Sequence, residues 1–455
     1  MSELKINLPE FSAINVGEVE ASVERLIAQC EAVIEKVATI ESPTWDNFVQ
    51  PQEEAQCELS NYFSPVSHLN SVMNTPELRD AYNACVPKFS AFYTRVGQNV
   101  DLYNATKRLR DSEHYITLSD AQKKSIENDL RGFRLSGVSL DADKKKQFGK
   151  LAEQLATATS QFSDNVLDAT NAWEKLITDP ADLKGLPESA MAAAKQRAEQ
   201  KDQQGWHLNL EFPTVYAVMT FCENRDLRKE VYIANGTRAS NLGPQAGQFD
   251  NSELMQSILR MRAEQASLLD FANYAEYSVV TKMVESPKQV TDFLNDLATR
   301  AVPMAKQELE ELEQFAKESL GIETLEAWDL GFAGDKLKQK LYDISDEDLK
   351  PYFPASKAIP GMFNVVGKLF GLDITPVIDV DIYQTDVSCY QIHDSAGELR
   401  GMFYLDNYAR ENKRGGAWMD VCRSRQKVSA AVQLPVAYLT CNLTPPVGDD
   451  PALLT

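Results

Sequence analysis

The sequence contains few histidines, and their spacing excludes the common helical zinc motif. Four are present, at His68, His114, His207 and His393, and no two of them are four residues apart. None is followed by glutamate, so H-E-x-x-H is absent. A helical zinc site needs two imidazoles one turn apart on the same face. We therefore interpret each isolated histidine as a surface or structural residue rather than a metal ligand.

Cysteines are also sparse and scattered. There are seven, the two nearest are Cys422 and Cys441, and no C-x-x-C occurs. An odd number at wide spacing is typical neither of a disulfide framework nor of a zinc finger. The pattern predicts buried free thiols in a reducing compartment, which favours the cytoplasm.

Positive charge and long apolar runs are lacking as well. The chain has 46 basic and 67 acidic residues and a formal net charge of −21, which is a poor match for nucleic acid or an anionic membrane. No apolar run approaches the roughly 20 residues that span a bilayer. The start, MSELKINLPEF, has no basic segment followed by an apolar one, as a secretory signal would. We expect neither a nucleic-acid nor a membrane partner.

Nucleotide-binding and nucleophile motifs are missing. G-x-G-x-x-G and G-x-S-x-G do not occur. The segment GMFNVVGKLF (361–370) has five residues between its glycines, and Leu369 stands where a phosphate loop needs Ser or Thr. We interpret this segment as part of a helix in the core.

Most of the chain has helical periodicity. In 290–316 apolar residues recur mostly every third or fourth position, with Glu and Lys between them, which predicts one amphipathic helix. Pro287 suits its first turn and Ser286 could cap it. The range 141–173 predicts one unusually long helix. Similar patterns cover 18–39, 76–110, 224–239 and 253–269.

Two stretches interrupt this pattern. Within 178–213, alternation from Trp206 to Phe212 predicts a short strand. In 374–443 β-branched and aromatic residues predict a hairpin turning at 395–398 and a third strand at 436–443. The predicted fold class is mainly α with a small antiparallel sheet near the C-terminal end. The predicted domains are an N-terminal helical domain (1–177), a connecting segment (178–222) and a third unit (223–455).

One run combines aromatic, cationic and glycine residues. It is YLDNYARENKRGGAWMDVC (404–422), and its members of interest are Tyr404, Tyr408, Arg410, Lys413, Arg414, Gly415, Gly416 and Trp418. Paired glycines let a backbone approach a ligand closely, and cations with aromatics suit peptide or carboxylate recognition. A tight turn with a solvated basic rim accounts for the same residues. The residue types leave both interpretations open.

The same run, as GELRGMFYLDNYARENKRGGAWMDVC followed by LPVAYLTCNLTPP, resembles the thimet-oligopeptidase family of zinc metallopeptidases. The resemblance extends through ENDLRGFRLSGVSLDADKKKQF (127–148), QFSDNVLDATNAW (161–173) and VDIYQTDVSCYQIHD (380–394). It implies a large two-lobed helical fold around a deep channel, with the small sheet on one wall. It also implies a generally monomeric zinc endopeptidase that hydrolyses short unstructured peptides. Tyr383 stands where a Trp is common in this family.

The resemblance further implies substrate contacts for Tyr404, Tyr408, Arg410, Arg414, Gly415 and Gly416. The family's zinc ligands lie on a helix carrying H-E-F-G-H, and 441–455 resembles the segment that leads to it. We therefore expect that 451–455 begins the approach to that helix and that the chain is truncated just before it. No catalytic or metal-binding residue is then assigned, the 455 residues alone are expected to be inactive, and 223–455 is the N-terminal part of the catalytic domain. Exposed apolar side chains are expected within 360–443, among them those of 402–405 and 436–443. The alternative is a metal-free helical peptide-binding or interaction protein.

Overall fold

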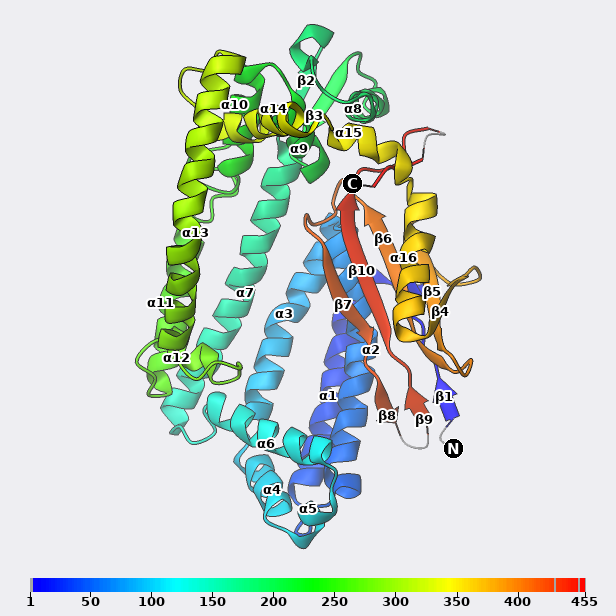
Figure 1. Cartoon of the computed structure of the whole chain (residues 1–455). Helices are drawn as coiled ribbons and strands as arrows, with labels where there is room; N and C mark the ends of the chain where they lie inside the picture. The colour runs from blue at the N-terminus through cyan, green and yellow to red at the C-terminus, as the bar shows by residue number, and fades with distance from the viewer. Residues whose placement is uncertain (1–2, 429–430, 449–450, 455) are drawn as a thin grey trace.

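The protein is mainly helical, as predicted, with long helices beside one small sheet (Figure 1). The computed structural model describes residues 3–428, 431–448 and 451–454. The helices are α1 (Val19–Ala38), α2 (Gln50–Val72), α3 (Pro76–Gly97), α4 (Val100–Arg110), α5 (Glu113–Thr117), α6 (Asp120–Leu135), α7 (Ala142–Ala172), α8 (Glu188–Gln200), α9 (Phe212–Phe221), α10 (Arg225–Gly236), α11 (Ser252–Leu268), α12 (Tyr274–Val279), α13 (Pro287–Phe315), α14 (Leu330–Tyr342), α15 (Asp346–Leu349) and α16 (Ala355–Phe370). None of the helices in these described ranges is both long and apolar enough to cross a membrane.

Local capping explains where the two longest helices begin. Ser286 Oγ accepts a hydrogen bond from the Gln289 amide at 3.2 Å, and Pro287 is the first residue of α13. Asp141 Oδ1 accepts from the Lys144 amide at 2.9 Å at the start of α7. Each cap satisfies an amide that has no partner within its helix. Both predicted helices are confirmed.

The predicted helix at 76–110 is two helices, α3 and α4. Gln98 and Asn99 separate them, and Asn99 Oδ1 accepts from the Leu102 amide at 3.0 Å. An Asn side chain that caps a new helix competes with continuation of the old one. In space α3 packs against α1, α2 and α7, and α7 also packs against α11. The long helix α7 therefore connects the N-terminal helices to α11 (Figure 1).

The main sheet has the strand order β4–β5–β6–β10–β7. The hairpin prediction is confirmed by β5 and β6, and β10 coincides with the predicted third strand. Because β10 runs parallel to β6 and antiparallel to β7, the sheet is mixed rather than wholly antiparallel. The strands are β4 (Leu372–Val377), β5 (Ser388–Asp394), β6 (Leu399–Tyr408), β7 (Trp418–Arg423) and β10 (Val436–Leu443).

Two smaller sheets complete the fold. The first contains β1 (Glu3–Lys5), β9 (Ala431–Gln433) and β8 (Gln426–Val428), in that order, so the start of the chain pairs with a segment more than 400 residues later. The second contains β2 (Glu174–Ile177) and β3 (Trp206–Asn209). The strand predicted from Trp206 is therefore confirmed but ends at Asn209, because Phe212 already begins α9.

The expected exposure of apolar side chains at 402–405 and 436–443 is wrong. Met402, Tyr404, Val436 and Tyr438 are all buried. One face of the sheet packs on Phe11 and on Leu69 of α2. The other face meets α16, where Phe363 packs edge-on against Tyr390, and Tyr390 stacks on Phe403. This second face is covered less fully, since Phe403, Ala437 and Leu439 are half-buried.

Exposed apolar side chains lie on α13 and α16, and those of α16 fall within the expected range 360–443. On α13 they are Phe293, Leu294, Leu297, Val302, Met304 and Leu309, and on α16 they are Met362, Val365, Leu369 and Phe370. Residues 451–454 are extended and lie beside the start of α16. There the Leu454 amide donates to the Phe353 carbonyl and the Ala355 amide to the Ala452 carbonyl, both at 2.8 Å. Thr455 is outside the described residues.

Candidate functional site

The loop between β6 and β7 (409–417) contains most of the predicted site residues and lies where three parts of the chain meet. Its Arg414 amide donates to the Ser71 carbonyl at the end of α2, at 2.8 Å. The Asn412 carbonyl accepts from the Asn74 amide at 3.0 Å, and Asn412 Oδ1 accepts from Asn171 Nδ2 of α7 at 3.3 Å. Asn412 has φ 62°, a left-handed conformation that asparagine tolerates better than most residues. The loop is thus held by helices far away in sequence.

A buried carboxylate fixes the start of this loop. Asp406, at 1% exposure, accepts hydrogen bonds from Arg410 Nη1 and Nη2 at 2.7 and 2.8 Å. Lys413 Nζ donates to Asp406 Oδ1 at 2.7 Å and to the Tyr408 carbonyl at 2.7 Å. Burial alone would raise the pKa of Asp406, but Arg410 and Lys413 outweigh it and hold that pKa below its usual value. Burial lowers the pKa of Lys413 to about 8, against the opposing charge of Asp406.

A tyrosine connects this carboxylate to His68. Tyr383 OH donates to Asp406 Oδ2 at 2.9 Å, and its oxygen lies 2.9 Å from His68 Nε2. Because the hydroxyl proton goes to Asp406, Nε2 of His68 carries the proton that Tyr383 accepts. The imidazole stacks on Tyr438 at 3.7 Å, and burial lowers its pKa to about 3. His68 is therefore a neutral structural residue, and Tyr383 contributes a hydroxyl that a Trp would lack.

The structure separates the predicted substrate contacts into three groups. Tyr404 is 1% exposed and packs edge-on against Phe11, so we remove it from the predicted contacts. Arg414, Gly415 and Gly416 form an exposed rim, which Asn442 Nδ2 holds by donating to the Arg414 carbonyl at 3.0 Å. Tyr408 and Arg410 line a cavity.

This cavity, which we call the Tyr408 cavity, has a volume of about 400 Å³. Its walls come from the end of α7, from α8, from β3 and the turn after it, and from the segment after β6. Residues that shape it include Asn171, Arg197, His207, Glu211, Asp386 and Glu411. Sequence reasoning did not find the residues of α8 and β3, because nothing in their spacing brings them to the 404–418 run.

Four acidic and three basic residues line the Tyr408 cavity, and the charges that form no ion pair within the described ranges are mostly negative, with Arg197 as the exception. Glu174 is held by Lys201 and by His207, whose Nε2 lies 3.2 Å from Glu174 Oε2. The guanidinium of Arg410 is already bound to Asp406 and to the Val72 carbonyl at 3.0 Å. Three further carboxylates line the cavity and form no ion pair with another described residue: Glu211, Asp386 and Glu411. A cationic or amide-rich ligand fits such walls better than an anion.

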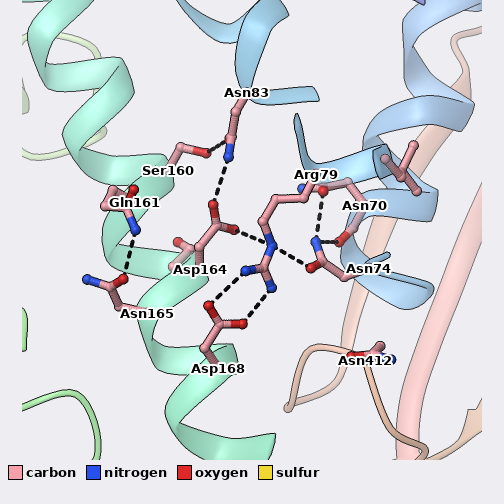
Figure 2. A network of polar contacts seen from close by, with 12 residues as sticks. Asn70, Asn74, Arg79, Asn83, Ser160, Gln161, Asp164, Asn165, Asp168 and Asn412 are labelled. Carbon is pink, nitrogen blue, oxygen red and sulfur yellow. Dashed lines mark hydrogen bonds and ion pairs between the residues drawn. The ribbon is translucent and has the colours of Figure 1, made fainter. Parts of the chain in front are cut away.

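A polar network joins α3 to α7 near Asn412 of the loop (Figure 2). Arg79 forms two hydrogen bonds to Asp168, both 2.7 Å, and one to Asn74 Oδ1, also 2.7 Å. Asp164 accepts from Asn83 Nδ2 at 2.9 Å. The spacing of Asp164, Asp168 and Asn171 on one helix face was visible in the sequence, but their partner Arg79 was not.

The described residues do not fit a catalytic metal. Zinc needs three protein ligands and an open position at a catalytic site. Among residues 3–428, 431–448 and 451–454, no three His, Cys, Asp or Glu side chains gather in a way that could hold an ion. The histidines lie on different elements: His68 on α2, His114 on α5, His207 on β3 and His393 on β5.

Comparison with known proteins defines the class. The family described as "Peptidase family M3" matches residues 218–455, and "Neurolysin/Thimet oligopeptidase, N-terminal domain" matches residues 23–145. The chain therefore belongs to peptidase family M3, and the resemblance seen in the sequence is confirmed.

Three relatives illustrate the similarity within this family. The chain is 50% identical over 451 residues to "Oligopeptidase A" of Salmonella typhimurium, and 50% identical over 450 residues to "Oligopeptidase A" of Escherichia coli. It is 38% identical over 464 residues to "Probable cytosolic oligopeptidase A" of Arabidopsis thaliana. These alignments cover 98–99% of this chain but only 65–66% of each relative. The chain thus spans slightly less than two thirds of the length of these relatives.

Proposed function

We propose that the protein is a metalloendopeptidase similar to oligopeptidase A, that its substrates are short unstructured peptides, and that the Tyr408 cavity binds them. The observation that carries the proposal is 50% identity to enzymes of that name across 99% of this chain, together with a cavity of about 400 Å³ that residues 408–411 of the family-like run help to line. A cavity of this size accepts a few residues of an extended chain but no folded domain.

The residues of the cavity support peptide binding in a specific way. An extended peptide presents amide and carbonyl groups, which need donors and acceptors at the wall. Tyr408, Asn171 and Asn209 offer such groups, and Gln384 adds an amide. Arg410 acts indirectly, because its guanidinium holds Asp406 and so fixes the backbone that presents Tyr408. Arg414, Gly415 and Gly416 remain predicted contacts at the rim.

The described residues do not fit a catalytic metal, and this limits the role that we assign to one. The family implies zinc, which polarises a water and a peptide carbonyl in such enzymes. Since the described residues provide no set of ligands, we assign no catalytic step to them. We expect the 455 residues, taken alone, to bind peptide without hydrolysing it. The alternative, a metal-free peptide-binding protein, uses the same cavity and differs only in whether hydrolysis occurs.

Other properties follow from the same proposal. A cytoplasmic location is supported by seven free thiols, six of them buried, which suit a reducing compartment. The net charge of −21 disfavours nucleic-acid partners. A monomeric state and the division at 177 and 222 stay predictions.

The test uses the purified 455-residue chain and a fluorescent pentapeptide. Fluorescence anisotropy should show saturable binding that Tyr408→Ala weakens. Tyr342→Ala is the matched control, because Tyr342 is an exposed tyrosine on α14 outside the cavity. Absence of saturable binding, or equal binding by both variants, would contradict the proposal. A quenched-fluorescent peptide and the bound zinc content then separate the alternatives. Stoichiometric zinc with turnover would show that these residues hold a catalytic metal after all.

A further inference from the structure

A second cavity adjoins the Tyr408 cavity, and the two share Arg197. The second one, which we call the apolar cavity, has a volume of about 550 Å³. Its lining is largely hydrophobic and includes Leu186, Phe212, Phe221, Phe353, Leu443 and Leu454. Ala193, Arg197, Glu211 and Pro445 line both cavities. The apolar cavity falls within the range of about 300–1,000 Å³ that is typical of small-ligand sites.

Arg197 is held firmly at the junction. It lies on α8, its Nε donates to the His207 carbonyl at 3.1 Å, and its Nη2 donates to Thr214 Oγ1 at 3.0 Å. Thr214 Oγ1 in turn donates to Asn209 Oδ1 at 2.8 Å. These bonds fix the guanidinium between β3 and α9. Its remaining nitrogen, Nη1, has no hydrogen-bond partner among the described residues.

The charge of Arg197 is not neutralised locally. Within the part of the chain that the structure describes, no carboxylate lies at ion-pairing distance from it. Burial lowers the pKa of the guanidinium, and the charge of Glu211 opposes this effect. Arginine remains charged in proteins, so a half-buried cation stands at the edge of a largely apolar space. Such a cation is stabilised by an anion that accepts hydrogen bonds from its free edge.

We propose that the apolar cavity binds the C-terminal residue of a peptide, with an apolar side chain inside it and the α-carboxylate on Arg197. The proposal rests on the proposed function, since the preceding residues of the peptide would lie in the Tyr408 cavity. The opposite character of the two cavities gives the peptide a direction: cationic or amide groups meet the acidic walls, and the apolar carboxylate end meets Arg197. An acidic side chain fits less well, because the lining is largely apolar and Glu211, which lines both cavities, would repel it.

The first test compares two peptides on the unaltered chain. Both carry an N-terminal fluorophore and end in Phe, one with a free carboxylate and the other with a carboxamide. A charge-assisted hydrogen bond contributes about 1.5–3 kcal/mol, which corresponds to a difference of roughly 10- to 100-fold in Kd. We expect the free acid to bind at least about tenfold more tightly. Equal binding would overturn the inference but leave the proposed function intact.

The second test compares variants on helix α8. Arg197→Met keeps most of the aliphatic stem and removes the charge, so the preference for the free acid should disappear. Lys195→Met is the matched control: Lys195 is exposed on the same helix and should keep the preference. Because Arg197 also connects β3 and α9, overall affinity could fall for structural reasons. The ratio of the two Kd values is therefore the readout, and an unchanged ratio in Arg197→Met would refute the assignment.

Two further experiments test whether the apolar side chain enters the cavity and whether the ligand is a peptide or a fatty acid. Ala190→Trp, which adds bulk at the lining of the apolar cavity, should weaken the Phe-terminated peptide more than one ending in Gly. Decanoate supplies an apolar carboxylate without a peptide. If decanoate displaced the peptide at lower concentration than the peptide's own unlabelled form, the site would be a fatty-acid site and this inference would be wrong. Failure of every peptide to bind would reject the proposed function as well.

Discussion

Replacing Asp406 by Asn tests whether one buried carboxylate holds the wall of the Tyr408 cavity. The substitution keeps the shape of the side chain and removes its charge. Asp406 lies between Arg410 and Lys413, with all three nitrogen–oxygen distances at 2.7–2.8 Å, and it also accepts from Tyr383. In the variant, Lys413, only 5% exposed, keeps its proximity to Arg410 without the anion between them.

The magnitude follows from the burial of the group. Removing one partner of a buried ion pair costs about 3–5 kcal/mol, because the remaining charge is left desolvated. Asp406 is 1% exposed and Lys413 5% exposed, so solvent screening gives little relief. At about 1.4 kcal/mol per factor of ten, the loop that depends on this cluster should open roughly 100- to 4,000-fold more often.

Hydrogen exchange measures this opening at named amides. The Arg414 amide donates to Ser71 and the Asn74 amide to Asn412, so both lose protection when the loop detaches from α2. Both should exchange about 100-fold faster or more in Asp406→Asn. Glu411→Gln is the control, since it removes a carboxylate from the exposed part of the same loop. If exchange at both amides stayed within about threefold of the parent chain, the Asp406 cluster would not be what holds the loop.

Other substitutions test neighbouring features. The pKa of Lys413 is lowered from 10.5 to about 8, so between these pH values the unfolded chain binds more protons and stability rises with pH. In urea unfolding, Lys413→Met should remove a rise in stability on the order of 1–3 kcal/mol between pH 7.5 and 9.5. The control Lys368→Met should keep that rise. Arg79→Met should speed hydrogen exchange at the α7 amides near Asp168, and its coupling to Asp168→Asn in a double-mutant cycle should be about 1 kcal/mol. Lys88→Met breaks a surface ion pair on the same helix and should leave exchange at those amides unchanged. Gly416→Ala should destabilise the loop by about 1–2 kcal/mol in urea unfolding, because Gly416 has φ 101°, whereas Gly415→Ala should be near neutral.

Elements whose limits depend on nearby residues were predictable from the sequence. Ser286 and Pro287 mark the start of α13, Asp141 marks the start of α7, and the turn at 395–398 joins β5 to β6. In each case the signal and the structure lie within a few residues of one another. Asn99 was the exception: the apolar pattern predicted one continuous helix over 76–110, and the role of Asn99 as the cap of α4 was missed.

Features that depend on distant partners were not predictable in the same way. In the sheet β10 lies between β6 and β7, and it pairs in parallel with β6. No local sequence pattern indicates that strand order. The burial of Met402 and Val436 required knowing that Phe11 and α2 cover one face of the sheet. Within the site, Tyr404 and Tyr408 look equivalent in sequence, yet four positions along β6 separate a core residue from a cavity residue.

The position of the 409–417 loop explains why its cavity can be both polar and well defined. Polar residues at a ligand site are usually mobile unless neighbouring bonds fix them. Here the loop backbone is bound to Ser71 of α2 and to Asn74, and the side chain of Asn412 is bound to Asn171 of α7. On the opposite wall, hydrogen bonds from Arg197 join α8 to β3 and α9. Each wall of the cavity is therefore fixed by its own contacts before a peptide binds. Because the peptide does not have to order the walls, less of the binding free energy is lost.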